Sequence, residues 1–109
     1  AKRELEKQGY NVEDMPLENP GFDLRAKKDS KELRVELKAH LGRGTVIELT
    51  GRQYAEYLAQ NRGGYNWQLW NVEYLEQNKS TVIITTYSTI PDEALDTKIF
   101  RVDLKKCSF

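Results

Sequence analysis

Two neighbouring segments with alternating side chains constrain this chain more than any other feature. Residues 21–28 and residues 31–39 both alternate between apolar and polar side chains. Successive side chains of a strand point to opposite faces, so this pattern predicts two strands that each bury one face. A turn between Asp29 and Ser30 joins them into an antiparallel hairpin in which Leu24 faces Val35. A shift by one residue would set Asp23 against an apolar side chain, so the alternation fixes the register.

This register brings like charges together on the polar face of the hairpin. Asp23 lies opposite Glu36, and Arg25 lies opposite Arg34. Like charges directly opposite each other destabilise a strand pair, and sequences keep such conflicts mainly at functional sites. A divalent cation between the two carboxylates removes their repulsion. Two hard oxygen donors suit Mg²⁺ or Mn²⁺ better than Zn²⁺.

Lys38 follows Glu36 by two residues and projects from the same predicted face. An ammonium group there is suited to hold a water nucleophile or to neutralise charge that develops on a phosphate. Two acids and a lysine around a divalent ion form an arrangement for phosphodiester hydrolysis. The same side chains are also expected on the solvated face of an ordinary amphipathic hairpin, and the residues alone leave both interpretations open.

Outside the hairpin the sequence predicts a mixture of helices and strands around a mixed sheet, an α/β (α+β) fold. Thr50 and Gln53 form a capping-box pattern that opens a helix ending before Gly63. The other predicted elements are a helix over residues 1–8, a short strand from Tyr10 towards Pro16, a third strand of the hairpin region over 45–49, and strands over 65–74, 81–87 and 99–104. The aromatic residues of the 65–74 strand are predicted to lie in the core.

Composition excludes several classes of protein. A chain of 109 residues has room for one domain. One cysteine and one histidine allow neither an internal disulfide nor a multi-histidine or thiolate zinc site. No apolar run approaches the ~18 residues of a membrane span. We therefore expect a single intracellular, cytoplasmic domain, and the missing initiator Met suggests a fragment of a longer chain.

Charge is unevenly distributed although the net charge is zero. Residues 24–62 hold nine basic and five acidic residues, and acidic segments flank them. Such a stretch is typical of a phosphate-facing surface, and equally of an ordinary solvated face. The arginines that would line a DNA backbone groove are Arg25, Arg34, Arg43 and Arg52. His40, in the loop predicted after the second hairpin strand, has no evident partner.

Two short motifs in the hairpin resemble a known family. Residues 19–25 (Asn-Pro-Gly-Phe-Asp-Leu-Arg) and residues 34–38 (Arg-Val-Glu-Leu-Lys) resemble the motif core of the PD-(D/E)XK nuclease superfamily. More closely, they resemble the domain named for the C-terminus of the plant NO VEIN protein, which also occurs in bacterial restriction and defence proteins. The resemblance covers roughly the first two-thirds of the chain, and residues 81–109 have no match.

The resemblance implies a restriction-endonuclease-like αβββαβ core with a mixed central sheet flanked by helices, followed here by an extra β-rich C-terminal segment. It implies that Asp23 and Glu36 are metal ligands, that the Leu37 carbonyl is a third ligand, and that Lys38 is the catalytic lysine. Gln53 and Tyr57 reproduce the Gln-xxx-Tyr spacing of RecB-type nucleases, which would make Gln53 part of the catalytic site. Helix capping by Gln53 and core packing by Tyr57 are the alternatives.

The predicted function is therefore that of a Mg²⁺- or Mn²⁺-dependent endonuclease acting on DNA in a restriction or defence system. The predicted partners are DNA, a helicase or ATPase domain on the same or another chain, and a second copy in a homodimer. The alternative is a catalytically inactive module of the same fold that binds nucleic acid or protein for a partner helicase or ATPase. The intact Asp23, Glu36 and Lys38 favour the enzyme. Ala39 and His40, where close relatives have Gly-Thr, favour the alternative.

Overall fold

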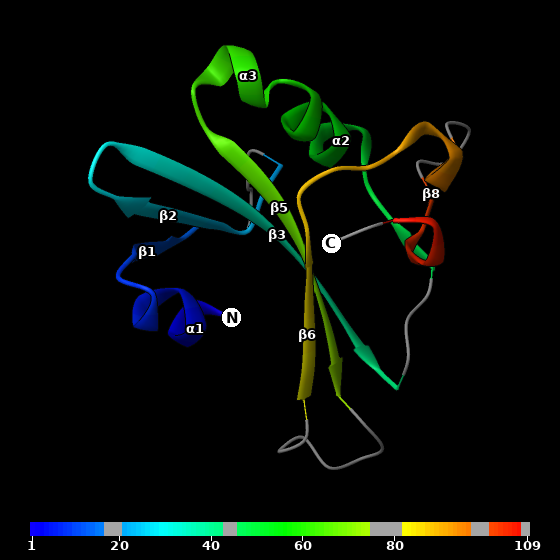
Figure 1. Cartoon of the computed structure of the whole chain (residues 1–109), viewed down its shortest axis with the longest axis horizontal. Coiled ribbons are helices and arrows are strands. Elements are labelled where there is room, and N and C mark those ends of the chain that lie inside the picture. The colour runs from blue at the N-terminus through cyan, green and yellow to red at the C-terminus, as the bar shows by residue number, and fades with distance from the viewer. Residues whose placement is uncertain (17–20, 43–45, 75–81, 97–100, 108–109) are drawn as a thin grey trace.

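A mixed five-stranded sheet forms the centre of the molecule, as predicted (Figure 1). The computed structural model describes residues 1–16, 21–42, 46–74, 82–96 and 101–107. The strand order is β1-β2-β3-β5-β6, with β3 and β5 parallel and the other neighbours antiparallel. The strands of this sheet are β1 (Asn11–Asp14), β2 (Leu24–Lys28), β3 (Lys31–Leu41), β5 (Asn66–Tyr74) and β6 (Val82–Tyr87).

The predicted register of the hairpin is confirmed. Leu24 pairs with Val35 and Arg25 pairs with Arg34. The first strand is shorter than predicted, because the ladder begins at Leu24 and Asp23 lies just beyond its end. The Asp23 backbone N–H donates to the Val35 carbonyl at 2.8 Å. Asp23 is therefore not a ladder partner of Glu36. Its carboxylate instead accepts a hydrogen bond from the Leu37 backbone N–H of β3.

The strand predicted over 45–49 is present, but its predicted placement with the hairpin strands is wrong. It forms β4 (Val46–Glu48), which pairs with β8 in a separate three-stranded sheet of order β4-β8-β7. Both sides of β3 are already occupied by β2 and β5, which leaves no free edge beside the hairpin. The remaining elements are η1 (Asp92–Ala94), β7 (Leu95–Asp96), β8 (Arg101–Asp103) and η2 (Leu104–Lys106).

The described residues also form three α-helices beside the sheets. Helix α1 (Lys2–Lys7) matches the prediction, and the capping box of Thr50 and Gln53 opens α2 (Gly51–Leu58). The predicted single helix is interrupted at Ala59, and α3 (Gln60–Gly63) follows, ending at Gly64 in the left-handed conformation. No helix in the described ranges has the length and apolar character needed to cross a membrane.

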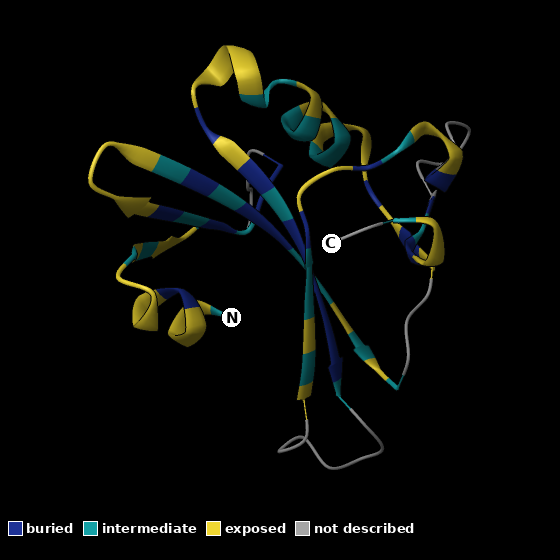
Figure 2. Ribbon diagram, in the orientation of Figure 1, coloured by how far each residue is buried: buried dark blue, intermediate teal, exposed yellow. Residues whose placement is uncertain are grey.

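The hydrophobic core has two parts, one on each face of the large sheet. Leu5 of α1 packs with Trp70 on one face. Leu69 precedes Trp70 in β5 and so points to the other face, where Tyr54 and Tyr57 of α2 pack against its cluster. The helices thus cover opposite faces, and the buried residues run along the centres of β3 and β5 (Figure 2). The prediction that the aromatic residues of β5 belong to the core is confirmed for Trp67 and Trp70.

Candidate active site

Asp23 is held at the point where the chain enters β2. Its carboxylate accepts a hydrogen bond from the Leu37 backbone N–H at 2.8 Å. Gly21, two residues earlier, has φ of +112°, and a Cβ there would lie 2.8 Å from the Arg52 carbonyl oxygen. Only glycine allows the chain to pass α2 this closely. The approach to α2 and the bond to β3 together fix the Asp23 carboxylate over the strand that carries Glu36.

Glu36 is a buried carboxylate. The residue is 1% exposed, although the alternation of β3 predicted its face to be polar. Its Oε2 lies 3.3 Å from the Lys38 Nζ, while its Oε1 is buried and has no hydrogen-bond partner among the described residues. Burial, together with the nearby negative charge of Asp23, raises the pKa of Glu36 to about 7, although Lys38 opposes this shift. The protein therefore holds an acid that its own groups do not fully neutralise.

Lys38 and Gln53 connect the strand to the helix. The Lys38 Nζ donates to the Gln53 Oε1 at 3.2 Å, and the same oxygen accepts the Thr50 backbone N–H at 2.8 Å. The Thr50 hydroxyl accepts the Gln53 N–H at 3.1 Å, which completes the capping box. Helix capping and contact with the candidate site were alternative roles for Gln53, and one amide oxygen performs both.

Tyr57, the second residue of the Gln-xxx-Tyr spacing, belongs to the core. Its ring lies edge-on to Trp67, with 4.9 Å between the ring centroids. Its hydroxyl accepts the Ile90 backbone N–H at 2.9 Å. These contacts support the core-packing alternative for Tyr57.

The donor set fits a small divalent cation. Within the described ranges, no group of three or more His, Cys, Asp or Glu side chains is placed to hold a metal. Asp23 and Glu36 offer two carboxylates to an ion. Coordination by the Leu37 carbonyl stays a prediction. Mg²⁺ is commonly bound by one or two carboxylates together with water and substrate phosphate oxygens. The unpartnered, buried Oε1 of Glu36 is the atom that such an ion would satisfy.

Two of the predicted arginines, Arg34 and Arg25, lie against carboxylates of the protein. The Arg34 guanidinium donates to Glu32 at 2.6 Å and to Glu56 at 2.9 Å, and lies 3.8 Å from the centroid of the Tyr65 ring. Its charge is therefore neutralised inside the protein. The Arg25 Nε lies 3.4 Å from a Glu32 carboxylate oxygen. Phosphate binding by Arg25 or Arg34 stays a prediction.

The other two predicted arginines differ in how far the structure places them. Arg52 is exposed in the first turn of α2, and Arg43 lies outside the described residues. Phosphate binding by these two arginines also stays a prediction.

Three further polar residues extend from the site along the same face of the sheet. His40 follows Lys38 by two residues within β3, which is longer than predicted, and its Nε2 is buried without a partner in the described part of the chain. In β5, Asn71 lies beside Lys38 and Glu73 beside His40, and both β5 residues are buried. Neither was predicted. The sequence contained one indication of these buried polar residues. Asn71 and Glu73 occupy alternate positions of a strand that is otherwise rich in core residues.

Residues 1–85 match the protein family described as Protein NO VEIN, C-terminal. The chain belongs to this family. The match extends somewhat beyond the two-thirds estimated from the motifs, and most of the segment predicted to be unmatched lies outside it. No curated protein matches the chain.

The fold of this NO VEIN C-terminal domain is similar to that of a solved nuclease. Hjc from Archaeoglobus fulgidus, a Holliday junction resolvase from an archaeal hyperthermophile, matches with a TM-score of 0.57 at 19% identity. The match covers 95% of this chain and 85% of the resolvase chain. It confirms the restriction-endonuclease-like fold of the PD-(D/E)XK nucleases, including part of the C-terminal region that the family match leaves out.

Proposed function

We propose that this domain is a Mg²⁺- or Mn²⁺-dependent endonuclease that hydrolyses DNA phosphodiester bonds. The observation that carries the proposal is the state of Glu36. Its carboxylate is buried beside Asp23, with one oxygen paired to Lys38 and the other without a partner in the described chain. A buried carboxylate in this state costs stability. A divalent cation held by Asp23 and Glu36 would offset that cost and would supply the chemistry for hydrolysis.

The side chains divide the work between binding the ion and handling charge. Asp23 and Glu36 would hold the ion, which supplies Lewis acidity towards a phosphate oxygen and lowers the pKa of bound water. Lys38 carries its ammonium group on the same face, where it orients the attacking water or offsets the negative charge that develops on the phosphate. Gln53 fixes Lys38 through the 3.2 Å hydrogen bond, so the ammonium is positioned before substrate arrives.

The setting of this activity rests on the family resemblance. We place the domain in a restriction or defence protein, beside a helicase or ATPase domain on the same or another chain, and active as a homodimer. Co-purification of a tagged domain with a motor protein, and its mass by light scattering, test these two assignments.

A second candidate is the same fold without turnover, which binds nucleic acid or protein for a motor partner. The residues that favour it are Ala39 and His40, which follow Lys38 where close relatives have Gly-Thr. Both residues lie in β3, directly after Lys38.

Calorimetric titration with Mn²⁺ tests the proposed function, followed by incubation with plasmid and linear DNA. We expect the wild-type protein to bind Mn²⁺ and to cleave DNA, and the Asp23→Asn/Glu36→Gln variant to do neither. The Glu13→Gln/Asp14→Asn variant is the matched control, because it removes the same charge from exposed positions on β1. Metal binding without cleavage of any DNA would favour the inactive module. Equal metal binding by wild type and the Asp23/Glu36 variant would overturn the assignment of the site.

A further inference from the structure

Among the described residues, the large sheet has two edge strands, β1 and β6, and they differ in charge (Figure 1). β1 carries Glu13 and Asp14, which are both exposed, and Lys2 of α1 lies 3.0 Å from Asp14. Charged side chains on an edge strand hinder its pairing with another chain. By contrast, β6 consists of Val-Ile-Ile-Thr-Thr-Tyr, and residues 80–91 contain no Asp, Glu, Lys or Arg. The β6 edge therefore lacks the charges that protect β1.

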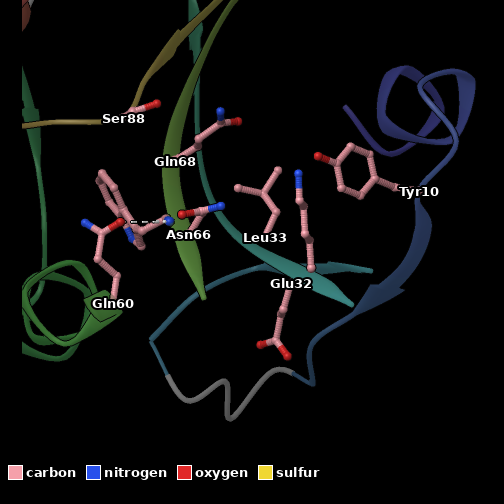
Figure 3. Close-up of a pocket in the computed structure, with 9 residues that line it drawn as sticks. Tyr10, Glu32, Leu33, Gln60, Asn66, Gln68 and Ser88 are labelled. Carbon is pink, nitrogen blue, oxygen red and sulfur yellow. Dashed lines mark hydrogen bonds between the residues drawn. The ribbon is translucent and has the colours of Figure 1, made fainter. Parts of the chain in front are cut away.

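The β6 edge is also long and regular. The six residues of β6 pair with residues 69–74 of β5 without a bulge, and no other described strand pairs with β6. The strand ends where the chain bends at Ser88, which lines a cavity of about 240 Å³ with Gln68 of β5 (Figure 3). The edge strands of the small sheet, β4 and β7, have three and two residues. β6 is thus the longest edge strand in the described part of the chain.

Two apolar side chains of β6 remain partly exposed. Val82 is 38% exposed and Ile84 is 39% exposed, and exposed bands run along the strand in Figure 2. Both residues lie on the face that carries Trp70 and α1, because Thr86, at the next alternate position, pairs with Trp70. A regular, uncharged and apolar edge strand is a template for pairing with a further strand.

We propose that β6 pairs antiparallel with β6 of a second copy of this chain, so that two five-stranded sheets become one continuous sheet. This inference deepens the homodimer of the proposed function and rests on it. A two-fold axis at Ile84 sets that residue opposite its own copy, Val82 opposite Thr86, and Ile83 opposite Thr85. All five residues are β-branched, and β-branched side chains pack well in cross-strand pairs.

The absence of charge favours a second copy as the occupant of this edge. In a symmetric antiparallel pair, both strands bring the same charges to one ladder. Pairing of β1 with itself would gather the carboxylates of Glu13 and Asp14 from both copies, whereas β6 pairs with itself without repulsion. The pair also closes at two copies, because each chain has one such edge. The candidate site stays clear of it, since β5 separates Glu36 and Lys38 of β3 from β6.

Sedimentation equilibrium of the 109-residue chain over a range of concentrations, without DNA or metal, tests the pairing. We expect the mass to rise from 12.7 kDa towards twice this value. Ile84→Lys sets two lysines opposite each other at the axis and should raise the dissociation constant by about 10-fold or more. Asn11→Lys is the matched control, because it adds the same charge at an exposed position of β1, and it should dimerise as the wild type does.

Oxidative cross-linking tests the register and does not depend on the lysine variant. The Cys107→Ser background removes the one native cysteine. In this background, Ile84→Cys should form a covalent dimer, because facing Cα atoms of an antiparallel pair lie at a separation that a disulfide spans. Asn11→Cys in the same background should stay uncross-linked.

Two results would overturn the inference. One is a mass of 12.7 kDa at every concentration, which leaves the β6 edge to a strand of another protein. The other is a dimer that Ile84→Lys does not weaken and that Ile84→Cys does not cross-link. Cleavage of DNA by a chain that stays monomeric would overturn the pairing and leave the proposed nuclease intact. A cross-linked dimer that cleaves no DNA would support the pairing and count against the nuclease.

Discussion

The polar face of the β2–β3 hairpin carries two like-charge pairs, and the protein treats them differently. Arg25 and Arg34 face each other in the ladder. Glu32 lies between them, 3.4 Å from Arg25 and 2.6 Å from Arg34, and Glu13 and Glu56 each reach one arginine from β1 and α2. Three carboxylates thus surround two guanidinium groups. The Arg25 Nε is buried and makes no hydrogen bond to the described residues, but the Arg25 guanidinium lies 3.4 Å from both Glu13 and Glu32. Ion pairs within the protein therefore account for the arginine pair.

The acidic pair, Asp23 and Glu36, lies two residues further along each strand. Fewer groups of opposite charge surround it. Asp23 accepts a backbone N–H from Leu37, and Glu36 pairs through one oxygen with Lys38. The other Glu36 oxygen stays buried without a partner in the described chain. A like-charge pair in a sequence is therefore not by itself evidence of a site. The informative case is the pair that the fold leaves uncompensated.

The largest expected effect is on DNA cleavage, and it distinguishes the two pairs. The same substitution, Glu to Gln, is made at two positions of β3. Glu36→Gln should reduce DNA cleavage by about 1000-fold or more, because it removes a charged ligand of the proposed ion. Glu32→Gln touches only the arginine pair and should keep cleavage within a few-fold of wild type. Initial rates on plasmid DNA at saturating Mg²⁺ measure both. Comparable losses in the two variants would contradict the distinction.

Relative to the wild type, Glu36→Gln should raise the free energy of unfolding above neutral pH, and Glu32→Gln should lower it. The pKa of Glu36 is raised to about 7, so the stability tied to its proton is full below about pH 4.5 and is lost as the pH rises through 7. Without metal, Glu36→Gln should thus match wild type near pH 4 and be more stable at pH 8 by up to about 3 kcal/mol.

The pKa of Glu32 is shifted in the opposite direction from that of Glu36. Partial burial acts to raise its pKa, but the hydrogen bond and charge of Arg34 outweigh it, so the pKa is lowered. Its contribution is present above the ordinary carboxyl range and is lost in acid. Glu32→Gln should therefore lower stability at neutral pH, by about 1 kcal/mol. Urea unfolding in EDTA across this pH range measures both, and a neutral or destabilising Glu36→Gln at pH 8 would refute the buried-acid argument.

A third prediction tests the arginine pair directly. Arg34→Met keeps most of the apolar stem but leaves Glu32 and Glu56 without their shared partner, so it should lower the free energy of unfolding by about 2 kcal/mol. Mn²⁺ affinity of the folded variant, measured by calorimetry, should stay within a few-fold of wild type. A large loss of Mn²⁺ affinity in a folded Arg34→Met protein would mean that the two pairs act as one unit.

The sequence predicted the hairpin and its register because strand alternation is a local property with period two. It did not predict the environment of either pair. Glu13 and Glu56 reach the arginines from elements distant in sequence. The burial of Glu36 likewise depends on how α2 and the second sheet pack on a face that its charges predicted to be polar.

The placement of β4 failed for a related reason. A three-residue strand carries little pattern of its own, and its partner β8 lies near the other end of the chain. Trp67 and Trp70 of β5 were predicted correctly as core residues, whereas Tyr74 at the end of the strand is only half-buried. Asn71 and Glu73, which are buried in the same strand, were not predicted. Their surroundings come from tertiary packing, which single-sequence periodicity does not encode.

The smallest expected effect concerns Gln53, whose amide oxygen serves both the helix cap and Lys38. Thr50→Ala removes the other half of the capping box and should cost about 1 kcal/mol of stability, with little change in cleavage. Gln53→Ala should cost a similar amount and also slow cleavage by about 10-fold, because Lys38 loses the acceptor that positions it. Paired measurements of unfolding and initial cleavage rate separate these roles. If the two variants lose stability and rate in the same proportion, Gln53 acts only as a cap, and the position of Lys38 depends on Glu36 instead.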